Sequence, residues 1–323
     1  MEEKKKKKEL KEFEEIERSL TTTFRIGLWQ RFTKAVATYK LLEEGDKVCC
    51  CISGGKDSMV MALLFLHLEK YSDFPFSVEY LVMDPGYSED NLNAIKNNLT
   101  RLHIPATIVK TDIFHIANST SDNPCYLCAK MRRGALYRIA KNLGCNKIAL
   151  GHHYDDVIET TLMNLLNAGS FQTMLPKLPS TNYKGMEIIR PMYLVREKDI
   201  LEFRDAYHLP FLQCACAFTQ RTCHDITSSH RALTKKLIAE LKESYNPQVE
   251  KNIFISSSNI VLDKNLGYKE GGIPHNYLEN YEEYKEKAFA KIEEEGIEDK
   301  AINKAEREHL PLVFDYSFNY RKK

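Results

Sequence analysis

The sequence predicts an α/β protein built on a doubly wound parallel sheet, and three observations support that class. Short apolar runs alternate with longer runs at helical spacing across residues 48–166, a pattern typical of strands connected by helices. A pair of glycines directly follows the first apolar run. Apolar residues form 43% and charged residues 28% of the 323 positions, which is ordinary for a globular protein of about two domains.

Taken in order, the apolar runs predict four parallel strands and the helices between them. The strands are expected at 48–52, 78–83, 106–109 and 147–150, and the helices at 59–68, at the apolar stripe from 92 to 102, and at 155–166. Ligands bind where the carboxyl ends of such strands meet, near the switch in strand order. Met83 and Asp84 at the end of the second strand and Gly151-His152-His153 after the fourth are therefore expected to reach the same nucleotide as the glycine loop.

The glycine loop, Ser53-Gly54-Gly55-Lys56-Asp57-Ser58, predicts an anion site between the first strand and the first helix. Two glycines allow a sharp turn that presents N–H groups, and the following helix adds the positive end of its dipole. The serine hydroxyls and Lys56 can bind phosphate oxygens. The common nucleotide motif G-x-x-x-x-G-K-[ST] is absent from the sequence. An ordinary Gly-Gly turn before a helix is the alternative interpretation.

The stretch Gly151-His152-His153-Tyr154-Asp155-Asp156 has two interpretations. Asp155 or Asp156 is a good N-cap for the following helix, and Asp156 with Glu159 has capping-box spacing. Two adjacent carboxylates that face a phosphate loop are also suited to Mg²⁺, which prefers oxygen ligands. Asp155 is the candidate magnesium ligand. The candidate catalytic residues are Lys56, Asp57 and Asp156.

The nine cysteines are expected to be thiols, catalytic groups or metal ligands, because the charged N-terminus is not a secretory signal. Cys125 and Cys128 form a C-x-x-C pair before a helix, a spacing that binds zinc or an iron–sulfur cluster or forms a redox pair. Further ligand candidates are Cys214, Cys216, Cys223 and His224. The other cysteines are expected to be buried core thiols, namely Cys49, Cys50, Cys51 and Cys145.

The net charge of +1 hides two basic segments. Residues 1–40 hold eleven Lys and Arg against seven Glu, and residues 125–150 hold six Lys and Arg with no acid. Such a segment can bind a polyanion although the protein as a whole is nearly neutral. A solvated helix surface is the alternative. The candidate RNA-binding residues are Lys130, Arg132, Arg133 and Lys141. Lys130, Arg133 and Lys141 share a helix face, with Tyr137 between them.

The two ends of the chain are predicted to be helical additions to the sheet domain. Residues 1–20 are a Lys/Glu run, expected to be a solvated helix or a disordered arm, and 22–42 form an aromatic, basic helix that packs or contacts nucleic acid. The expected division is 1–42 for the arm, 43–212 for the sheet domain, 213–260 for the distal cysteine segment and 261–323 for a helical extension. No apolar run reaches the roughly 18 residues of a membrane span, so a cytoplasmic protein is expected.

These motifs together resemble the tRNA 2-thiocytidine synthetase family, a branch of the PP-loop N-type ATP pyrophosphatases that includes iron–sulfur-dependent tRNA thiolases. The resemblance covers residues 22–260. It implies an adenine nucleotide alpha hydrolase-like fold and cleavage of ATP between its α and β phosphates. The matching stretches are Ser53–Ser58, Cys125-x-x-Cys128 with Arg132-Arg133-Gly134, Gly151-His152-His153-x-Asp155-Asp156, Arg190-Pro191 and Arg196-Glu197-Lys198-Asp199-Ile200.

The resemblance also implies cofactors, partners and a third metal ligand. It implies a [4Fe-4S] cluster held by Cys125, Cys128 and, by position, Cys214, with one iron open to sulfide. The family pattern Pro-Cys-x-x-Cys is replaced here by Gln213-Cys214-Ala215-Cys216, so Cys216 and Cys223 stay as candidates. The implied cofactors besides the cluster are ATP and Mg²⁺. The implied partners are tRNA and a sulfur donor such as a cysteine desulfurase, and a homodimer is one option for the assembly.

The reaction that this resemblance implies is ATP-dependent tRNA thiolation. A pyrimidine carbonyl, in the first place the 2-position of a cytidine in the anticodon loop, is adenylated and its oxygen is replaced by sulfur. The implied ATP-binding residues are Ser53, Gly54, Gly55, Lys56, Asp57, Ser58, Met83, Asp84 and Gly151. Two alternatives stay open: another PP-loop tRNA-modifying enzyme of the thiouridine or lysidine type, and an RNA-binding protein with a structural zinc site.

Overall fold

A computed structural model describes residues 2–120, 124–212 and 230–295 of the chain. The chain divides into two compact units, the first ending at Ser258 and the second beginning at Asn259. The predicted third cysteine ligand, Cys214, and its alternatives Cys216 and Cys223 lie outside the described residues. None of the helices in the described part of the chain has the length and hydrophobicity that a membrane span needs.

The first unit is built on a mostly parallel sheet, as the sequence predicts. Its described residues form six strands in the order β3-β2-β1-β4-β6-β5, and β5 alone among them runs antiparallel to its neighbour. The two short strands β5 and β6 were not expected. The strands are β1 (Lys47–Ile52), β2 (Ser77–Asp84), β3 (Ala106–Lys110), β4 (Lys147–Ala149), β5 (Lys177–Pro179) and β6 (Glu187–Ile189).

Helices connect the strands and extend the first unit at both ends. The helix expected at 59–68 is longer, because it begins at the phosphate loop itself. The helices are α1 (Glu2–Thr21), the π-helix η1 (Arg25–Trp29), α2 (Gln30–Thr38), α3 (Lys56–Tyr71), α4 (Glu89–Arg101), α5 (Ile113–Thr120), α6 (Pro124–Asn142), α7 (Tyr154–Ala168), α8 (Glu197–Ala206), α10 (His230–Ser244) and α11 (Val249–Ser256).

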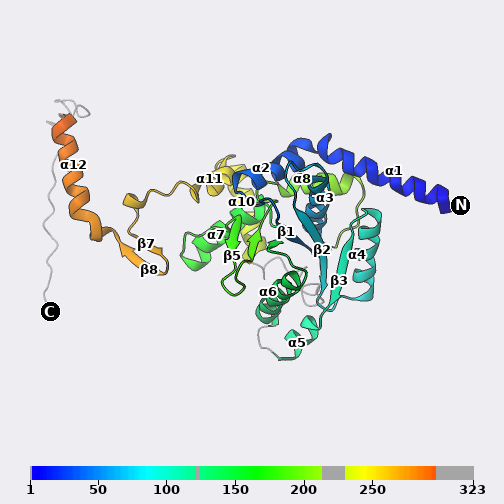
Figure 1. Ribbon diagram of the computed structural model, residues 1–323. Helices are drawn as coiled ribbons and strands as arrows, with labels where there is room; N and C mark the ends of the chain where they lie inside the picture. The colour runs from blue at the N-terminus through cyan, green and yellow to red at the C-terminus, as the bar shows by residue number, and fades with distance from the viewer. Residues whose placement is uncertain (1, 121–123, 213–229, 296–323) are drawn as a thin grey trace. The chain divides into compact units, whose positions relative to one another are not determined.

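Alternating side chains of β1 bury the two faces of the sheet under different helices. Val48, Cys50 and Ile52 point into the main core, which contains residues of α1 to α4 and α8. Cys49 packs on the opposite face against a smaller core that contains Tyr137 and Ala140 of α6. Figure 1 accordingly shows α3 and α6 on opposite sides of β1 and β2. This three-layer arrangement is the doubly wound architecture.

The N-terminal helices pack onto the sheet domain. Ile16 and Leu20 of α1 are fully buried, so the end of this charged helix is docked rather than solvated. Trp29 makes an edge contact with His67 of α3, their ring centroids 4.8 Å apart. Of the two interpretations of residues 22–42, the packing helix therefore accounts for its aromatic residues.

The strand order reverses between β1 and β4, which pair directly and in parallel. From β1 the chain adds strands toward β3, and from β4 it adds strands toward β6. Such a switch point leaves a crevice at the carboxyl ends of the two central strands. The loop after β1 contains Ser53, and the loop after β4 contains Gly151. The fold therefore directs both predicted nucleotide-binding segments to one place.

In its described residues, 259–295, the second unit is only partly the helical extension expected for 261–323. It contains a hairpin of β7 (Gly267–Glu270) and β8 (Ile273–Asn276), flanked by the short 3₁₀ helices η3 (Leu262–Lys264) and η4 (Tyr277–Asn280), and only α12 (Tyr281–Glu295) fits the prediction. Gly271 and Gly272 join the strands with φ of 58° and 87°. Positive φ at both turn positions is what a two-residue type I′ hairpin requires, so helical continuation stops there.

Candidate active site

The phosphate loop is held in a closed turn by its own serines. The Ser58 hydroxyl donates to the Gly55 carbonyl oxygen at 2.9 Å and accepts from the Ser53 N–H at 3.1 Å. Gly54 has φ of +83°, and a Cβ there would lie 2.6 Å from the Ile95 side chain. Only glycine suits that position. The loop is therefore preorganised to present N–H groups and the N-terminus of α3, a general anion site.

The end of the segment after α8 pairs with this loop. The Leu212 N–H donates to the Gly54 carbonyl oxygen at 3.0 Å, and Leu212 forms a parallel bridge with Gly55. Leu212 is the last described residue before the stretch that contains Cys214, Cys216 and Cys223. The chain thus enters its distal cysteine segment at the phosphate loop.

Lys56 and Asp57 form the centre of a charge network. The Lys56 ammonium lies 3.0 Å from Asp57 Oδ1 and 3.2 Å from Glu197 Oε1. Lys235 of α10 pairs with the second oxygen of Glu197. Burial acts to lower the pKa of Lys56, but the neighbouring carboxylates of Asp57 and Glu197 outweigh it and raise that pKa. Lys56 therefore stays positively charged beside the loop.

The two neighbouring carboxylates at the start of α7 have separate environments, and neither is the N-cap. His153 is the N-cap, and it forms a capping box in which Asp156 Oδ2 accepts from the His153 N–H at 3.0 Å. This corrects the predicted cap at Asp155 or Asp156 and the predicted box between Asp156 and Glu159. An imidazole nitrogen accepts the helix N–H here, as the oxygen of a common cap residue would.

Asp155 is turned away from the nucleotide cavity. Its two oxygens bind the Arg196 guanidinium at 2.9 Å and the Glu197 N–H at 2.7 Å. Arg196 also pairs with Glu250 of α11 at 2.9 Å. Asp155 therefore joins α7 to α8 and α11, and its oxygens are already bound. Asp155, the predicted magnesium ligand, and Asp156, a predicted catalytic residue, therefore differ in their surroundings, because only Asp156 lines the nucleotide cavity.

A cavity of 330 Å³ lies over the switch point and collects most of the predicted nucleotide site. Its lining combines polar groups of the loops with apolar side chains, including Met83. Asp84 lies beside it, where Oδ1 accepts from the N–H groups of Gly86 and Tyr87 at 2.9 and 2.7 Å. The cavity is lined by Cys51, Ile52, Ser53, Asp57, Ser58, Leu81, Met83, Tyr87, Arg132, Leu136, Leu150, Gly151, His152 and Asp156.

Gly151 is required by a close backbone approach. A Cβ on Gly151 would lie 3.1 Å from the backbone of both Asp57 and Ser58. The loop after β4 therefore rests directly on the phosphate loop, and a side chain at Gly151 would push the two apart. This contact explains why a glycine at the end of the fourth strand belongs to the site.

Tyr87 lines the cavity although the sequence did not single it out, and His152 lines it as expected for the segment after the fourth strand, although it was given no role of its own. The Tyr87 hydroxyl donates to the Ser53 carbonyl oxygen at 3.4 Å. Burial lowers the pKa of His152 to about 4, a shift that Arg190 and Arg231 support and Asp156 opposes. Its Nδ1 is buried and has no hydrogen-bond partner among the described residues. A neutral imidazole thus faces the cavity.

The C-x-x-C helix contributes to the same cavity. Arg132 lines it, and Cys128 lies one turn earlier on α6, packed against the cluster of Met83, Ile113 and Ala135. Residues four apart share a helix face, so Cys128 lies on the side of α6 toward the nucleotide cavity. The backbone of Cys125 belongs to the first turn of α6. Among the described residues no cluster of three metal-ligating side chains occurs.

The predicted RNA-binding residues separate into two groups. Lys130, Arg133 and Lys141 are exposed on α6, whereas Arg132 is partly buried in the cavity. Tyr137 is not part of the exposed face, because it is buried under Tyr183, with stacked rings 4.9 Å apart. The cationic face formed by Lys130, Arg133 and Lys141 therefore lacks the aromatic ring that the sequence placed within it.

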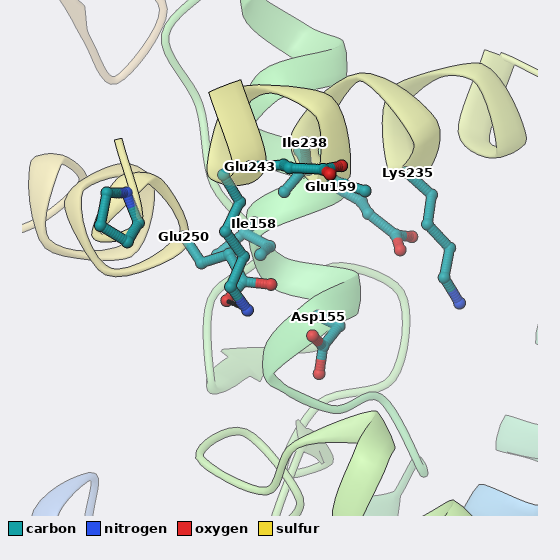
Figure 2. A pocket seen from close by; sticks show the side chains of 10 residues that line it. Asp155, Ile158, Glu159, Lys235, Ile238, Glu243 and Glu250 are labelled. Carbon is teal, nitrogen blue, oxygen red and sulfur yellow. Dashed lines mark hydrogen bonds and ion pairs between the residues drawn. The ribbon is translucent and has the colours of Figure 1, made fainter. Parts of the chain in front are cut away.

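A second, larger recess lies between α7, α10 and α11, next to the site (Figure 2). It measures 460 Å³, and Ile158 and Ile238 form its apolar floor. Figure 2 shows Asp155, Lys235 and Glu250 around it, on three different helices. Two of its carboxylates are engaged, since Asp155 binds Arg196 and Glu250 binds both Arg196 and Lys242. The residues that line the recess come from the three helices and their connection and include none of the phosphate loop, so the recess is a helix junction rather than the nucleotide site.

Comparison with known proteins agrees with this geometry. The PP-loop domain family matches residues 27–217. The chain is 35% identical over 232 residues to the tRNA-cytidine(32) 2-sulfurtransferase of Shewanella sediminis, covering 70% of each chain. It is 33% identical over 254 residues to the enzyme of that name from Nitrosospira multiformis, covering 74% of this chain and 82% of the relative.

A solved structure shares the fold. The U34-tRNA thiolase NcsA from Methanococcus maripaludis, determined with its [4Fe-4S] cluster, superposes with a TM-score of 0.53 at 20% identity, over 73% of this chain and 80% of that chain. The family match, the curated relatives and the switch-point cavity lead to one assignment. The chain belongs to the tRNA-cytidine(32) 2-sulfurtransferase family of PP-loop proteins, and it is an ATP-dependent tRNA sulfurtransferase.

Proposed function

We propose that this protein adenylates the C2 carbonyl oxygen of a cytidine in the tRNA anticodon loop and replaces that oxygen with sulfur. The supporting observation is that the phosphate loop and the helix with the C-x-x-C pair, α6, both line one cavity. Ser53 and Ser58 of the phosphate loop line it from one side, and Arg132, one turn from Cys128, lines it from another. An ATP site and a thiol-bearing helix so close together suit a reaction that first activates an oxygen and then substitutes it.

The activation step follows from the chemistry of the carbonyl. An amide-like carbonyl oxygen is a poor leaving group, so it must be converted into a better one. The oxygen attacks the α-phosphorus of ATP, the bond to the bridging oxygen breaks, and pyrophosphate leaves. A sulfide equivalent then adds at C2, and the C2–O bond breaks with AMP as the leaving group. The oxygen of cytidine thus ends in AMP, and no electrons are transferred overall.

The chain's own groups stabilise the charge that develops on the phosphates. Lys56 is held by Asp57 and Glu197 at the start of α3. The loop N–H groups and the Ser58 hydroxyl supply fixed dipoles at the same point. Preorganised donors of this kind are commonly the largest source of rate in such transfers. Arg132 lines the same cavity and adds a positive charge there.

Magnesium would be held by Asp57 and Asp156 rather than by Asp155. Asp57 Oδ1 is buried and accepts no hydrogen bond within the described chain, although the Lys56 ammonium is near. Asp156 lines the nucleotide cavity and Asp155 does not, and this position, rather than the number of bound oxygens, distinguishes the two carboxylates, since Asp156 also accepts from the His153 N–H and pairs with Arg231. Carboxylate oxygens suit this cation, which would neutralise the polyphosphate.

The donor set of α6 fits an iron–sulfur cluster. Cys125 and Cys128 are one turn apart at the start of the helix, a spacing that lets two thiolates bind one cluster. We propose Cys214 as the third ligand. Bound through three cysteines, such a cluster would offer one iron as a coordination position for sulfide. The sulfur donor is proposed to be a separate protein of the cysteine desulfurase class.

Product analysis tests the activation step. Purified protein incubated with radiolabelled ATP, Mg²⁺ and unmodified tRNA should form AMP and pyrophosphate, with AMP release dependent on tRNA. Accumulation of ADP and inorganic phosphate as the main products would contradict the proposed chemistry.

A further inference from the structure

A second cavity adjoins the nucleotide cavity and shares Asp57 and Asp156 with it as common walls. It measures 280 Å³. The first cavity has apolar side chains suited to a base, including Met83 and Leu150, whereas the second is almost entirely charged. The second cavity is lined by Lys56, Asp57, His153, Asp156, Glu159, Glu197, Arg231, Ala232 and Lys235.

Three cations from two helices converge on this second cavity. Lys56 comes from the phosphate loop, and Arg231 and Lys235 lie one turn apart on α10. Arg231 Nη1 lies 2.6 Å from Asp156 Oδ1 and 3.2 Å from Glu159 Oε2. Lys235 and Lys56 share the carboxylate of Glu197. These ion pairs link helix α10 to the phosphate loop through Glu197 and to α7 through Asp156 and Glu159.

A phosphate can reach the cations of these pairs, because the Arg231 side chain is 43% exposed and that of Lys235 is 57% exposed. Their partners are mostly buried, with Asp156 20%, Glu159 7% and Glu197 19% exposed, so these carboxylates need another cation when a phosphate takes over Arg231 and Lys235. A guanidinium binds phosphate oxygens through two parallel hydrogen bonds. Four carboxylates line the cavity against three cations, which favours a polyphosphate that arrives with a divalent cation over a bare anion.

We propose that Arg231 and Lys235 bind the β- and γ-phosphates of ATP, and the pyrophosphate that leaves, in this second cavity. The nucleoside then occupies the first cavity, and the α-phosphate lies near Asp57 and Asp156, where the two cavities meet. This inference rests on the proposed ATP-dependent activation. It assigns the outer half of the ATP site to α10, which follows the distal cysteine segment in the chain.

Binding of inorganic pyrophosphate, ATP and AMP to the full chain in Mg²⁺, measured by calorimetry, tests this assignment. Arg231→Met should weaken pyrophosphate and ATP binding about ten- to hundredfold, as expected for loss of a charged hydrogen-bond donor. AMP binding should change less than twofold, because AMP lacks the β- and γ-phosphates. The pyrophosphate affinity of Arg231→Lys should lie between those of the wild type and Arg231→Met. Lys236→Met is the matched control, since Lys236 is exposed on the same helix and pairs with Glu240.

Two results would overturn the assignment. One is wild-type pyrophosphate affinity in Arg231→Met. The other is an equal loss for AMP and pyrophosphate, which would mean that Arg231 only fastens α10 to α7. If Arg231→Met does not fold, Lys235→Met decides, with a threefold or greater loss expected for pyrophosphate and none for AMP. A protein that binds pyrophosphate through Arg231 but never thiolates tRNA would refute the proposed function and leave this inference standing.

Discussion

Lys56 at the start of α3 and Glu197 at the start of α8 form an ion pair, with 3.2 Å between Nζ and Oε1. Although burial disfavours the charged carboxylate, Lys235 and Lys56 lower the pKa of Glu197 to about 2. Both partners are therefore charged at neutral pH. The pair fixes the position of the ammonium group at the phosphate loop. It connects the loop to α8, and through Lys235, the second partner of Glu197, to α10.

Lys56→Ala should remove most of the thiolation activity and leave the fold intact. The side chain faces the site, and loss of one preorganised charge at a transferring phosphate typically costs about 10²-fold or more in rate. The thermal midpoint should change little, because Glu197 keeps its second partner, Lys235. The check is the rate of AMP formation together with a thermal melt.

Lys70→Ala is the matched control for that variant. Lys70 lies in the last turn of the same helix and pairs with Glu17 of α1, far along α3 from the loop. It should retain wild-type AMP formation. Equal activity in Lys56→Ala and Lys70→Ala would remove Lys56 from the mechanism.

His152 should make the stability fall between pH 6.5 and pH 4. Burial lowers its pKa to about 4 in the folded chain, while an unfolded histidine titrates near 6.5. In that interval the unfolded chain binds the extra proton, so the free energy of unfolding decreases as the pH falls. A shift of this size corresponds to roughly 2 to 3 kcal/mol over the interval.

Urea unfolding at pH 7 and pH 5 measures this dependence. His152→Gln should lose part of the decrease that the wild type shows, whereas His115→Gln, at an exposed position of α5, should keep it. An identical pH dependence in His152→Gln and the wild type would show that His152 does not titrate in this way.

The exposed face of α6 should contribute to tRNA binding. Reversal of Lys130, Arg133 and Lys141 to Glu should weaken binding, and the slope of log affinity against log salt should become shallower by about 2 to 3, because each lost phosphate contact removes close to one released counterion. Fluorescence titration across a salt series gives both quantities. A triple reversal of Lys96, Lys198 and Lys236, exposed elsewhere on the unit, supplies the same charge change. Equal effects in both variants would mean that α6 is an ordinary solvated surface.

Substitution of single cysteines should separate cluster ligands from core thiols. Cys125→Ala, Cys128→Ala and Cys214→Ala should each abolish the visible iron–sulfur absorption and thiolation, with ATP binding retained. Cys145→Ala and Cys223→Ala should keep both the iron–sulfur absorption and the thiolation activity. Cys145 is buried, and the neighbouring Cys49 thiol together with burial raises its pKa far above its usual range, so it stays a protonated thiol. Full iron content in Cys214→Ala would transfer the ligand role to Cys216 or Cys223.

The sequence predicted the parts of the site that depend on local pattern. The phosphate loop, the four parallel strands and the convergence of Ser53, Met83 and Gly151 follow from hydrophobic periodicity, glycine placement and the geometry of parallel sheets. These signals lie within a few residues of the features that they predict, so one sequence is enough to find them.

The features that the sequence did not predict depend mainly on contacts with residues remote in the chain. Asp155 and Asp156 look alike in sequence, but Arg196 binds the first and Arg231 the second, and only the second lines the nucleotide cavity. The three-residue strand β6 is too short for a periodic signal. The hairpin after Gly267 did have a local signal, the Gly271-Gly272 pair, which the helical interpretation of the tail overlooked.

The most direct test of the account is nucleoside mass spectrometry of tRNA treated with the reconstituted protein. The assay contains ATP, Mg²⁺ and a sulfur source, with omission of ATP and the Lys56→Ala protein as controls. The account predicts 2-thiocytidine that forms only with ATP and the wild-type loop, in proportion to the AMP released. Unmodified cytidine throughout, or sulfur that appears in a uridine instead, would contradict it.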